Sequence, residues 1–84
     1  MKKFIAEIDV MPRRELLDPQ GKAVTLNIKN LDLHGVDDVR IGKHISVEIS
    51  AVDAAQANTL IQSACEKLLA NPIMETFMFR LNEA

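Results

Sequence analysis

The sequence predicts an α+β fold of the ferredoxin-like class: a βαββαβ two-layer sandwich whose four-stranded antiparallel sheet carries two helices on one face. Two observations lead to this prediction. Apolar residues alternate with polar ones in the first and last segments, as in half-buried strands, and recur every three or four residues in two segments between them, as in helices. The chain has 84 residues and no internal linker, so we expect one domain, residues 1–84.

The first element is a strand over residues 3–10, KFIAEIDV, where apolar and acidic side chains alternate. Pro12 stops it, because proline cannot donate a hydrogen bond to a sheet. A helix is expected from Pro19 to about Asp32. The Asp18 carboxylate can cap its first free N–H groups, and proline suits the first helical position, where its missing N–H costs nothing.

This first helix is apolar on two sides, so it needs two partners. One partner is its own sheet, and the other is a second chain. The short chain also favours assembly, because small domains bury little surface alone. We therefore expect a homo-oligomer, either a dimer or a dimer of dimers. The core stripe is Val24, Ile28 and Leu31, and the second set is Ala23, Leu26 and Leu33.

Residues 36–50, VDDVRIGKHISVEIS, are predicted to form two strands and a tight turn. A three-residue loop over Gly42, Lys43 and His44, with glycine supplying an unusual φ, keeps the apolar residues on one face. The predicted pairs are Ile41 with Ile45 and Val39 with Val47.

A second helix is expected within residues 51–71, because Asp53 and Gln56 have capping-box spacing. Asn71 can end this helix in a left-handed conformation, and Pro72 cannot continue it. Residues 75–81, ETFMFRL, alternate as a last strand. The apolar stripe of the helix is Ala57, Leu60, Ile61, Ala64 and Leu68.

Composition excludes several functions. The net charge of −2 argues against nucleic acid, which selects a basic face. Acidic residues interrupt the apolar part of the N-terminus and no apolar run approaches membrane-spanning length, so we expect no signal peptide, no membrane contact and a cytoplasmic location. With three glycines, no CxxC and no His/Cys cluster, the chain predicts neither a phosphate loop nor a metal site.

Few residues remain as chemical candidates. Cys65 flanks the second helix's stripe and is interpreted as a packed structural thiol. His34 and His44 lack an evident partner. Arg13 and Arg14 could hold phosphate, although a solvated turn is favoured. We therefore predict no catalytic, cofactor-binding or metal-binding residue in this chain.

Three segments carry a family resemblance: LLDPQGKAV (16–24), VDDVRIGKHISVEI (36–49) and CEKLLANPIMETFMF (65–79). Together they resemble the PurS family, the small subunit of phosphoribosylformylglycinamidine synthase. The resemblance spans nearly the whole chain, in order. One departure is TLNIKNL in the first helix, where the family more often has a small residue and leucine before the last turn.

The resemblance implies a non-catalytic subunit of a three-part ligase of de novo purine (IMP) synthesis. In this family a large synthetase subunit binds ATP and formylglycinamide ribonucleotide, and a glutaminase subunit releases ammonia from glutamine. The small subunit, a homo-oligomer, bridges the two and supports ammonia transfer that yields formylglycinamidine ribonucleotide. ATP, Mg²⁺ and glutamine then belong to the complex, and this chain holds no cofactor.

The resemblance also selects positions in this sequence. We interpret five as shaping the backbone and three as contacts with partner chains. For residues 40–43, at the tip of the predicted hairpin, the requirements of the tight turn alone could account for the residue types. The backbone-shaping positions are Asp18, Pro19, Gly42, Asn71 and Pro72, and the partner-contact candidates are Arg40, Lys43 and Glu75.

An ACT-like amino-acid-sensing regulatory module, which shares the topology, is the alternative function. Such modules usually present a glycine-bearing turn between the first strand and helix. Here that turn is MPRRELLDPQG, with its glycine inside the helix start. An acylphosphatase-like enzyme is a weaker alternative, because the Arg13/Arg14 turn lacks the glycines of a phosphate-cradling loop.

Overall fold

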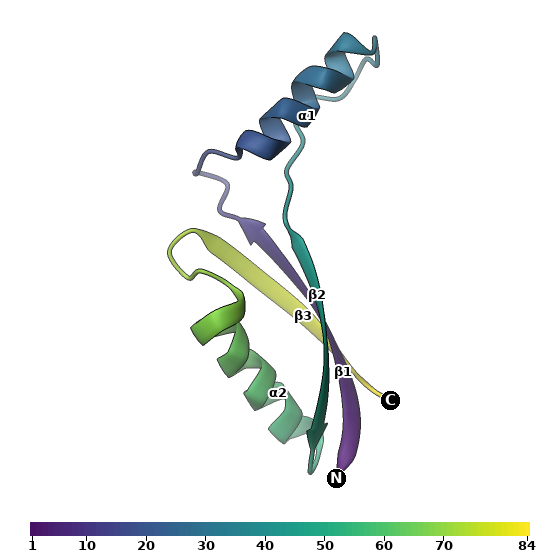
Figure 1. The fold of residues 1–84 in the computed structure, drawn as a ribbon, viewed down its shortest axis with the longest axis vertical. Coiled ribbons are helices and arrows are strands. Elements are labelled where there is room, and N and C mark those ends of the chain that lie inside the picture. The colour runs from purple at the N-terminus through teal and green to yellow at the C-terminus, as the bar shows by residue number, and fades with distance from the viewer.

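A computed structural model describes all residues, 1–84. Its elements lie along the chain as three strands, two α-helices and a single π-helical turn (Figure 1). They are β1 (Lys2–Pro12), α1 (Pro19–Asn30), β2 (Lys43–Ala51), α2 (Ala54–Ala64), the π-turn (Cys65–Leu69) and β3 (Glu75–Glu83).

The sheet is antiparallel and has the order β2-β1-β3, with β1 in the centre. Ala6 lies between Val47 and Leu81, and Ile8 lies between Ile45 and Phe79. Apolar residues therefore occupy one face in all three strands, as the alternation predicts. The opposite face is mostly polar and no helix covers it.

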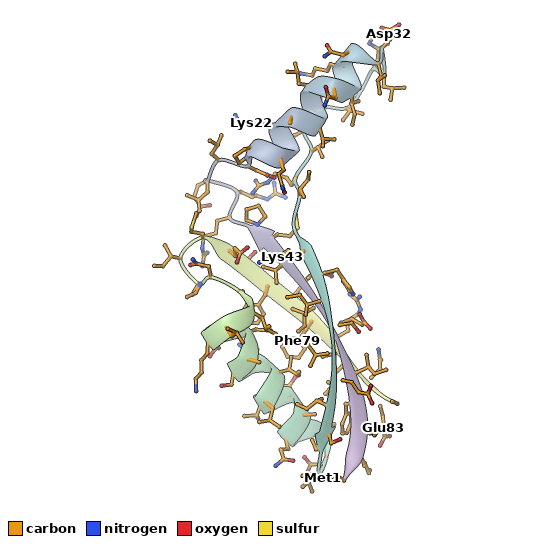
Figure 2. The ribbon with its side chains drawn as sticks, viewed as in Figure 1. Met1, Lys22, Asp32, Lys43, Phe79 and Glu83 are labelled. Atoms are coloured by element: carbon orange, nitrogen blue, oxygen red, sulfur yellow. The ribbon has the colours of Figure 1, made fainter.

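The core lies between α2 and the apolar face of the sheet. Ile8 and Val10 of β1 are fully buried, as are Ile61 of α2 and Cys65 of the π-turn. Phe79, labelled in Figure 2, lies on the side of the sheet that faces α2 and packs against this cluster. The predicted packed thiol at Cys65 is confirmed.

The prediction of two helices on one face is wrong for the single chain. Helix α1 extends away from the sheet as an arm (Figure 1), and only α2 packs against the strands. The molecule measures 52 × 26 × 14 Å, and its radius of gyration is 16.6 Å. A compact chain of this length has a radius of gyration of about 12 Å. Of the expected apolar side chains of α1, three are largely exposed: Leu26, Leu31 and Leu33.

The predicted four-stranded sheet is also wrong, because residues 36–42 form no strand. The hairpin pairs Ile41–Ile45 and Val39–Val47 do not form. Instead β2 pairs with β1, and the residues before it bond to α1: the Val39 N–H donates to Thr25 Oγ1 at 2.9 Å. The long-range partner β1 offers nine residue positions to β2, far more than the local hairpin. This pairing therefore takes precedence over the local turn.

Helix α2 ends differently from the prediction. The Ala70 N–H donates to the Cys65 carbonyl at 3.0 Å, an i→i+5 bond that makes the last turn a π-turn. The wider turn shifts the side chains that follow, so Leu68 leaves the stripe and is 82% exposed. Asn71 does not adopt a left-handed conformation: positive φ occurs at Asp32 and Gly35 alone, and not at Gly42.

Candidate functional site

The eight site positions expected from the sequence gather at one end of the sheet. This region, the junction, comprises residues 12–19, 39–43 and 71–76. Here β1 ends, β2 and β3 begin, and the arm formed by α1 leaves the sheet (Figure 1). In Figure 2, Lys43 marks the place where the arm meets the sheet.

Asp18 joins the start of α1 to the segment before β2. Its Oδ1 accepts a hydrogen bond from the Gly21 N–H at 3.0 Å, which is the predicted helix cap. Its Oδ2 accepts from the Ile41 N–H at 2.8 Å. The Ile41 bond, then the Gly21 bond, and the charge of Arg40 lower the pKa of the Asp18 carboxyl. The predicted backbone-shaping role of Asp18 thus extends beyond the helix cap.

Arg40 holds the loop that follows β1. Its Nη2 donates to the carbonyls of Pro12 at 2.7 Å and Arg13 at 2.9 Å. Its Nε lies 3.8 Å from Asp18 Oδ2, an ion pair that is too long for a hydrogen bond. The Arg40 side chain is only 25% exposed, so its main contacts are within the chain. A contact between Arg40 and a partner chain stays a prediction.

Arg13 holds the turn between the π-turn and β3. Its Nη2 donates to the Pro72 carbonyl at 2.7 Å and its Nε to the Ile73 carbonyl at 3.1 Å. Asn71 supports the same turn, because its Oδ1 accepts from the Ile73 and Met74 N–H groups at 3.0 and 3.3 Å. The sequence indicated a shaped turn at Asn71-Pro72. It carried no signal for the bond from Arg13, whose partners lie near the other end of the chain.

Lys43 and Glu75, two of the partner-contact candidates, form an ion pair, with Nζ 3.6 Å from Oε2. The other oxygen of Glu75 accepts from the Asn71 N–H at 2.8 Å, which orients the carboxylate. Beside the pair lies a hollow of about 310 Å³. Five of the predicted positions line it: Asp18, Pro19, Gly42, Lys43 and Glu75.

Gly42 is required for close packing, and not for the unusual φ that the predicted turn needed. A Cβ at this position would lie 2.2 Å from the Val10 carbonyl oxygen and 2.3 Å from Met11 Sδ. A Cβ on Gly21 would likewise lie 2.2 Å from the Val39 carbonyl oxygen. Both glycines let the segment before β2 approach its neighbours closely.

Apolar side chains are exposed around the junction. Leu17 is 69% exposed, Ile73 81% and Met74 54%. Exposed apolar side chains next to an ion pair provide both the apolar and the polar contacts that protein-binding surfaces use.

Outside the junction, His44, Glu7 and Asp9 form a cluster of titratable side chains on the open face of the sheet. His44 bonds Asp9 through Nδ1 at 2.7 Å and Glu7 through Nε2 at 2.6 Å. The Asp9 bond, then the Glu7 bond, raises the pKa of His44, and the same contacts lower the pKa values of Glu7 and Asp9. The imidazole therefore favours its charged form, which is a poor general base.

The remaining groups that could carry chemistry are the single cysteine and the metal-ligating side chains. Burial raises the pKa of the Cys65 thiol, with a smaller contribution from Glu66, which disfavours the nucleophilic thiolate. The His, Cys, Asp and Glu side chains form no group of three that could hold a metal ion. No helix is both long and apolar enough to cross a membrane.

Comparisons with known proteins agree with the motifs. The PurS family model, described as phosphoribosylformylglycinamidine (FGAM) synthase, matches residues 5–83. The chain is 39% identical to the synthase subunit PurS of Synechocystis sp., over 93% of this chain and 78% of that protein. It is 35% identical to the Bacillus subtilis subunit, over 95% of this chain and 94% of that protein.

Solved structures give the same result for the fold. A chain of the structure of PurLQS from Thermotoga maritima superposes with a TM-score of 0.88 at 32% identity, covering 100% of both chains. The B. subtilis PurS structure superposes with a TM-score of 0.85 at 34% identity, covering 95% of this chain and 99% of that one. The chain therefore belongs to the PurS family, the PurS subunits of the ligase phosphoribosylformylglycinamidine synthase.

Proposed function

We propose that this chain is the non-catalytic subunit that bridges the synthetase and glutaminase subunits of the synthase and supports ammonia transfer between them. The observation that carries the proposal is the full-length likeness to a chain of the T. maritima PurLQS structure. In that assembly PurS is named together with two other components. A chain that matches it from end to end is suited to the same position.

The junction supports a role in binding. Four of its charged side chains, those of Arg13, Asp18, Arg40 and Glu75, bond to backbone carbonyls or amides, which fixes the shape of this part of the surface. Fixed charges beside exposed apolar groups favour partner choice and rapid association more than stability. We place the contact with the partner subunits here, with Lys43 and Glu75 as the candidate contact residues.

Residues 1–84 then form a single PurS-like domain that works in the cytoplasm. ATP, Mg²⁺ and glutamine are used by the other two subunits, and this chain holds none of them. The isolated chain should neither hydrolyse glutamine nor turn over ATP.

A second copy of the chain explains the exposed arm. Helix α2 covers the sheet alone, and apolar side chains on that face, including Ile45, Val47 and Phe77, are only partly buried. We propose a dimer in which α1 of each chain packs beside α2 of its partner. This arrangement restores two helices on one sheet face and buries Leu26 and Leu31.

Light scattering at micromolar concentration tests the dimer. Leu26→Glu should yield monomers, because it places a charge in the proposed contact. Asn27→Glu is the matched control, since it adds the same charge at the next exposed position of α1. A monomeric wild-type protein would exclude the arrangement.

Reconstitution with the two partner subunits tests the bridging role. Omitting this chain should abolish glutamine-dependent synthesis but affect synthesis from concentrated ammonia much less, because free ammonia bypasses delivery. Equal loss of both activities contradicts bridging. Titration calorimetry of the isolated chain with glutamine should show no binding, whereas saturable binding would favour the ACT-like alternative.

A further inference from the structure

Three of the four arginines in this acidic chain line a single pocket. The pocket has a volume of about 410 Å³ and lies where the loop after β1 meets the start of β3. Its basic residues are Arg13, Arg14 and Arg40, and the Thr76 side chain completes one wall. A pocket of this size can accept a small ligand.

The positive charge in this pocket is only partly neutralised within the chain. Neither Arg13 nor Arg14 forms an ion pair, and Arg40 pairs with Asp18 alone. Glu15 is the only carboxylate in the lining. Even with Asp18 included, the positive charges at the pocket exceed the negative ones by one. A protein of net charge −2 therefore concentrates positive charge at this place.

Two of the three guanidinium groups are held in position. Arg13 donates through Nε and Nη2 to the carbonyls of Ile73 and Pro72, which leaves its Nη1 without a hydrogen-bond partner. Arg40 is fixed by the Pro12 and Arg13 carbonyls. The Arg14 side chain makes no hydrogen bond. The pocket thus offers one oriented donor group and one guanidinium that is free to close over a ligand.

We propose that this pocket binds a phosphoryl group. Planar guanidinium groups match the oxygens of phosphate in two-point contacts, and donors already in position lose little entropy on binding. Arg13 Nη1 and the Arg14 guanidinium would contact the oxygens, with the Thr76 hydroxyl as a third donor. No aromatic side chain lines the pocket, so nothing is placed to stack on a base. The ligand is recognised by its phosphoryl oxygens, whether it is free phosphate or part of a nucleotide.

Titration calorimetry of the full chain at low salt tests the site, with inorganic phosphate, pyrophosphate, ADP and adenosine as probes. Pyrophosphate should bind with one site per chain. ADP should bind with similar affinity, and adenosine should not bind. Raising the salt concentration to physiological levels should weaken the binding, because exposed charges are screened.

Arg14→Gln is the informative variant, because that side chain makes no bond within the chain and its loss should leave the fold intact. It should weaken pyrophosphate binding by roughly tenfold, the effect of losing one charged hydrogen bond. Arg80→Gln is the matched control: it removes the same charge from the open sheet face, where Arg80 pairs with Asp9. Its affinity should equal that of wild type.

Several results would overturn the proposal. These are absence of saturable pyrophosphate binding, an equal loss in the Arg14 and Arg80 variants, or ADP binding far more tightly than pyrophosphate. Binding of an acidic peptide without binding of pyrophosphate would assign the pocket to a partner chain instead. The bridging role does not depend on this site, so reconstituted glutamine-dependent synthesis distinguishes failure of one proposal from failure of the other.

Discussion

Lys43 and Glu75 form an ion pair across the end of β1: Lys43 begins β2 on one side of the central strand, and Glu75 begins β3 on the other. Lys43 pairs with Val10 of β1 in the sheet register, and Glu75 pairs with Pro12. The Lys43 side chain is 59% exposed and that of Glu75 is 22% exposed. The pair therefore presents one accessible cation and one oriented carboxylate at the junction.

Reversing either charge of this pair should weaken binding to the partner subunits. Lys43→Glu should change stability by about 1 kcal/mol or less, because an ion pair of an exposed lysine contributes little to folding. Glu75→Lys should cost more, because it also removes the hydrogen bond from the Asn71 N–H. Lys43→Glu and Glu75→Lys are compared with wild type by co-elution and by glutamine-dependent synthesis. The double variant Lys43→Glu/Glu75→Lys retains an ion pair within the chain but exchanges the positions of its positive and negative charges. If it binds partners as wild type does, the pair serves only the fold, and the partner surface lies elsewhere.

Arg40→Gln should destabilise the chain by roughly 1–3 kcal/mol, because it removes charge-assisted hydrogen bonds to two backbone carbonyls. Arg40→Lys should not restore stability, since an ammonium group lacks the planar fork that reaches both carbonyls. Urea unfolding followed by circular dichroism measures the effect. Arg14→Gln serves as the control and should unfold like wild type. Equal stability of the Arg40 and Arg14 variants would contradict a stabilising role for the bonds from Arg40 to the loop after β1.

Ile61→Ala should reduce stability by about 2–5 kcal/mol, because the side chain is 1% exposed and its removal leaves a cavity against β1. Leu68→Ala should have an effect of less than about 1 kcal/mol, because that side chain is 82% exposed. The sequence alone places Leu68 in the apolar stripe of this helix, together with Ile61. Comparing the two variants by urea unfolding checks the π-turn, since a continuous α-helix predicts a large effect for both.

The His44 cluster should make stability depend on pH. The pKa of His44 is raised, so its contribution is complete below the ordinary value of 6.5 and is lost as pH rises through the raised value. The pKa values of Glu7 and Asp9 are lowered from 4.5 and 3.8, so their contribution is present above those values and is lost as pH falls through the lowered ones. The cluster should stabilise most between about pH 4.5 and 6.5.

Urea midpoints of wild type and His44→Gln, measured across this range and above it, test the dependence. The difference between the two proteins should shrink as the solution becomes alkaline. His34→Gln is the control, because that imidazole is 88% exposed near the end of α1. A constant difference between wild type and His44→Gln at all pH values would show that the cluster does not titrate as expected.

Local signals predicted the elements well. The alternation in β1 and β3 and the Asp18-Pro19 start of α1 each depend on neighbouring residues, and the structure confirms them. The Asp53 cap is also confirmed, since Asp53 Oδ1 accepts from the Gln56 N–H at 2.8 Å. Gln56 Oε1 accepts from the Val52 N–H at 2.7 Å, and not from the Asp53 N–H as in a capping box.

Non-local contacts account for what the sequence did not predict. Residues 36–42 alternate as a strand does, yet their amides bond to Asp18 and Thr25, which the alternation cannot reveal. The bonds from Arg13 and Arg40 likewise join segments that are far apart in the chain. The family resemblance predicts which residues belong to the site, but not that they lie together. They gather at one end of the sheet because the sheet has one strand fewer than the sequence predicts.

The α1 arm separates the chain into parts of unequal stability. An isolated helix of 12 residues is marginal in water, and α1 gains support mainly at its first half, from the Asp18 cap and the bond between Thr25 and Val39. The amides of α1 beyond Thr25 should therefore exchange with deuterium faster than those of α2. They should become protected only as the protein concentration rises and copies associate. The second half of α1 would thus become ordered only by contact with another copy of the chain. The concentration of the protein in the cell would determine when that occurs.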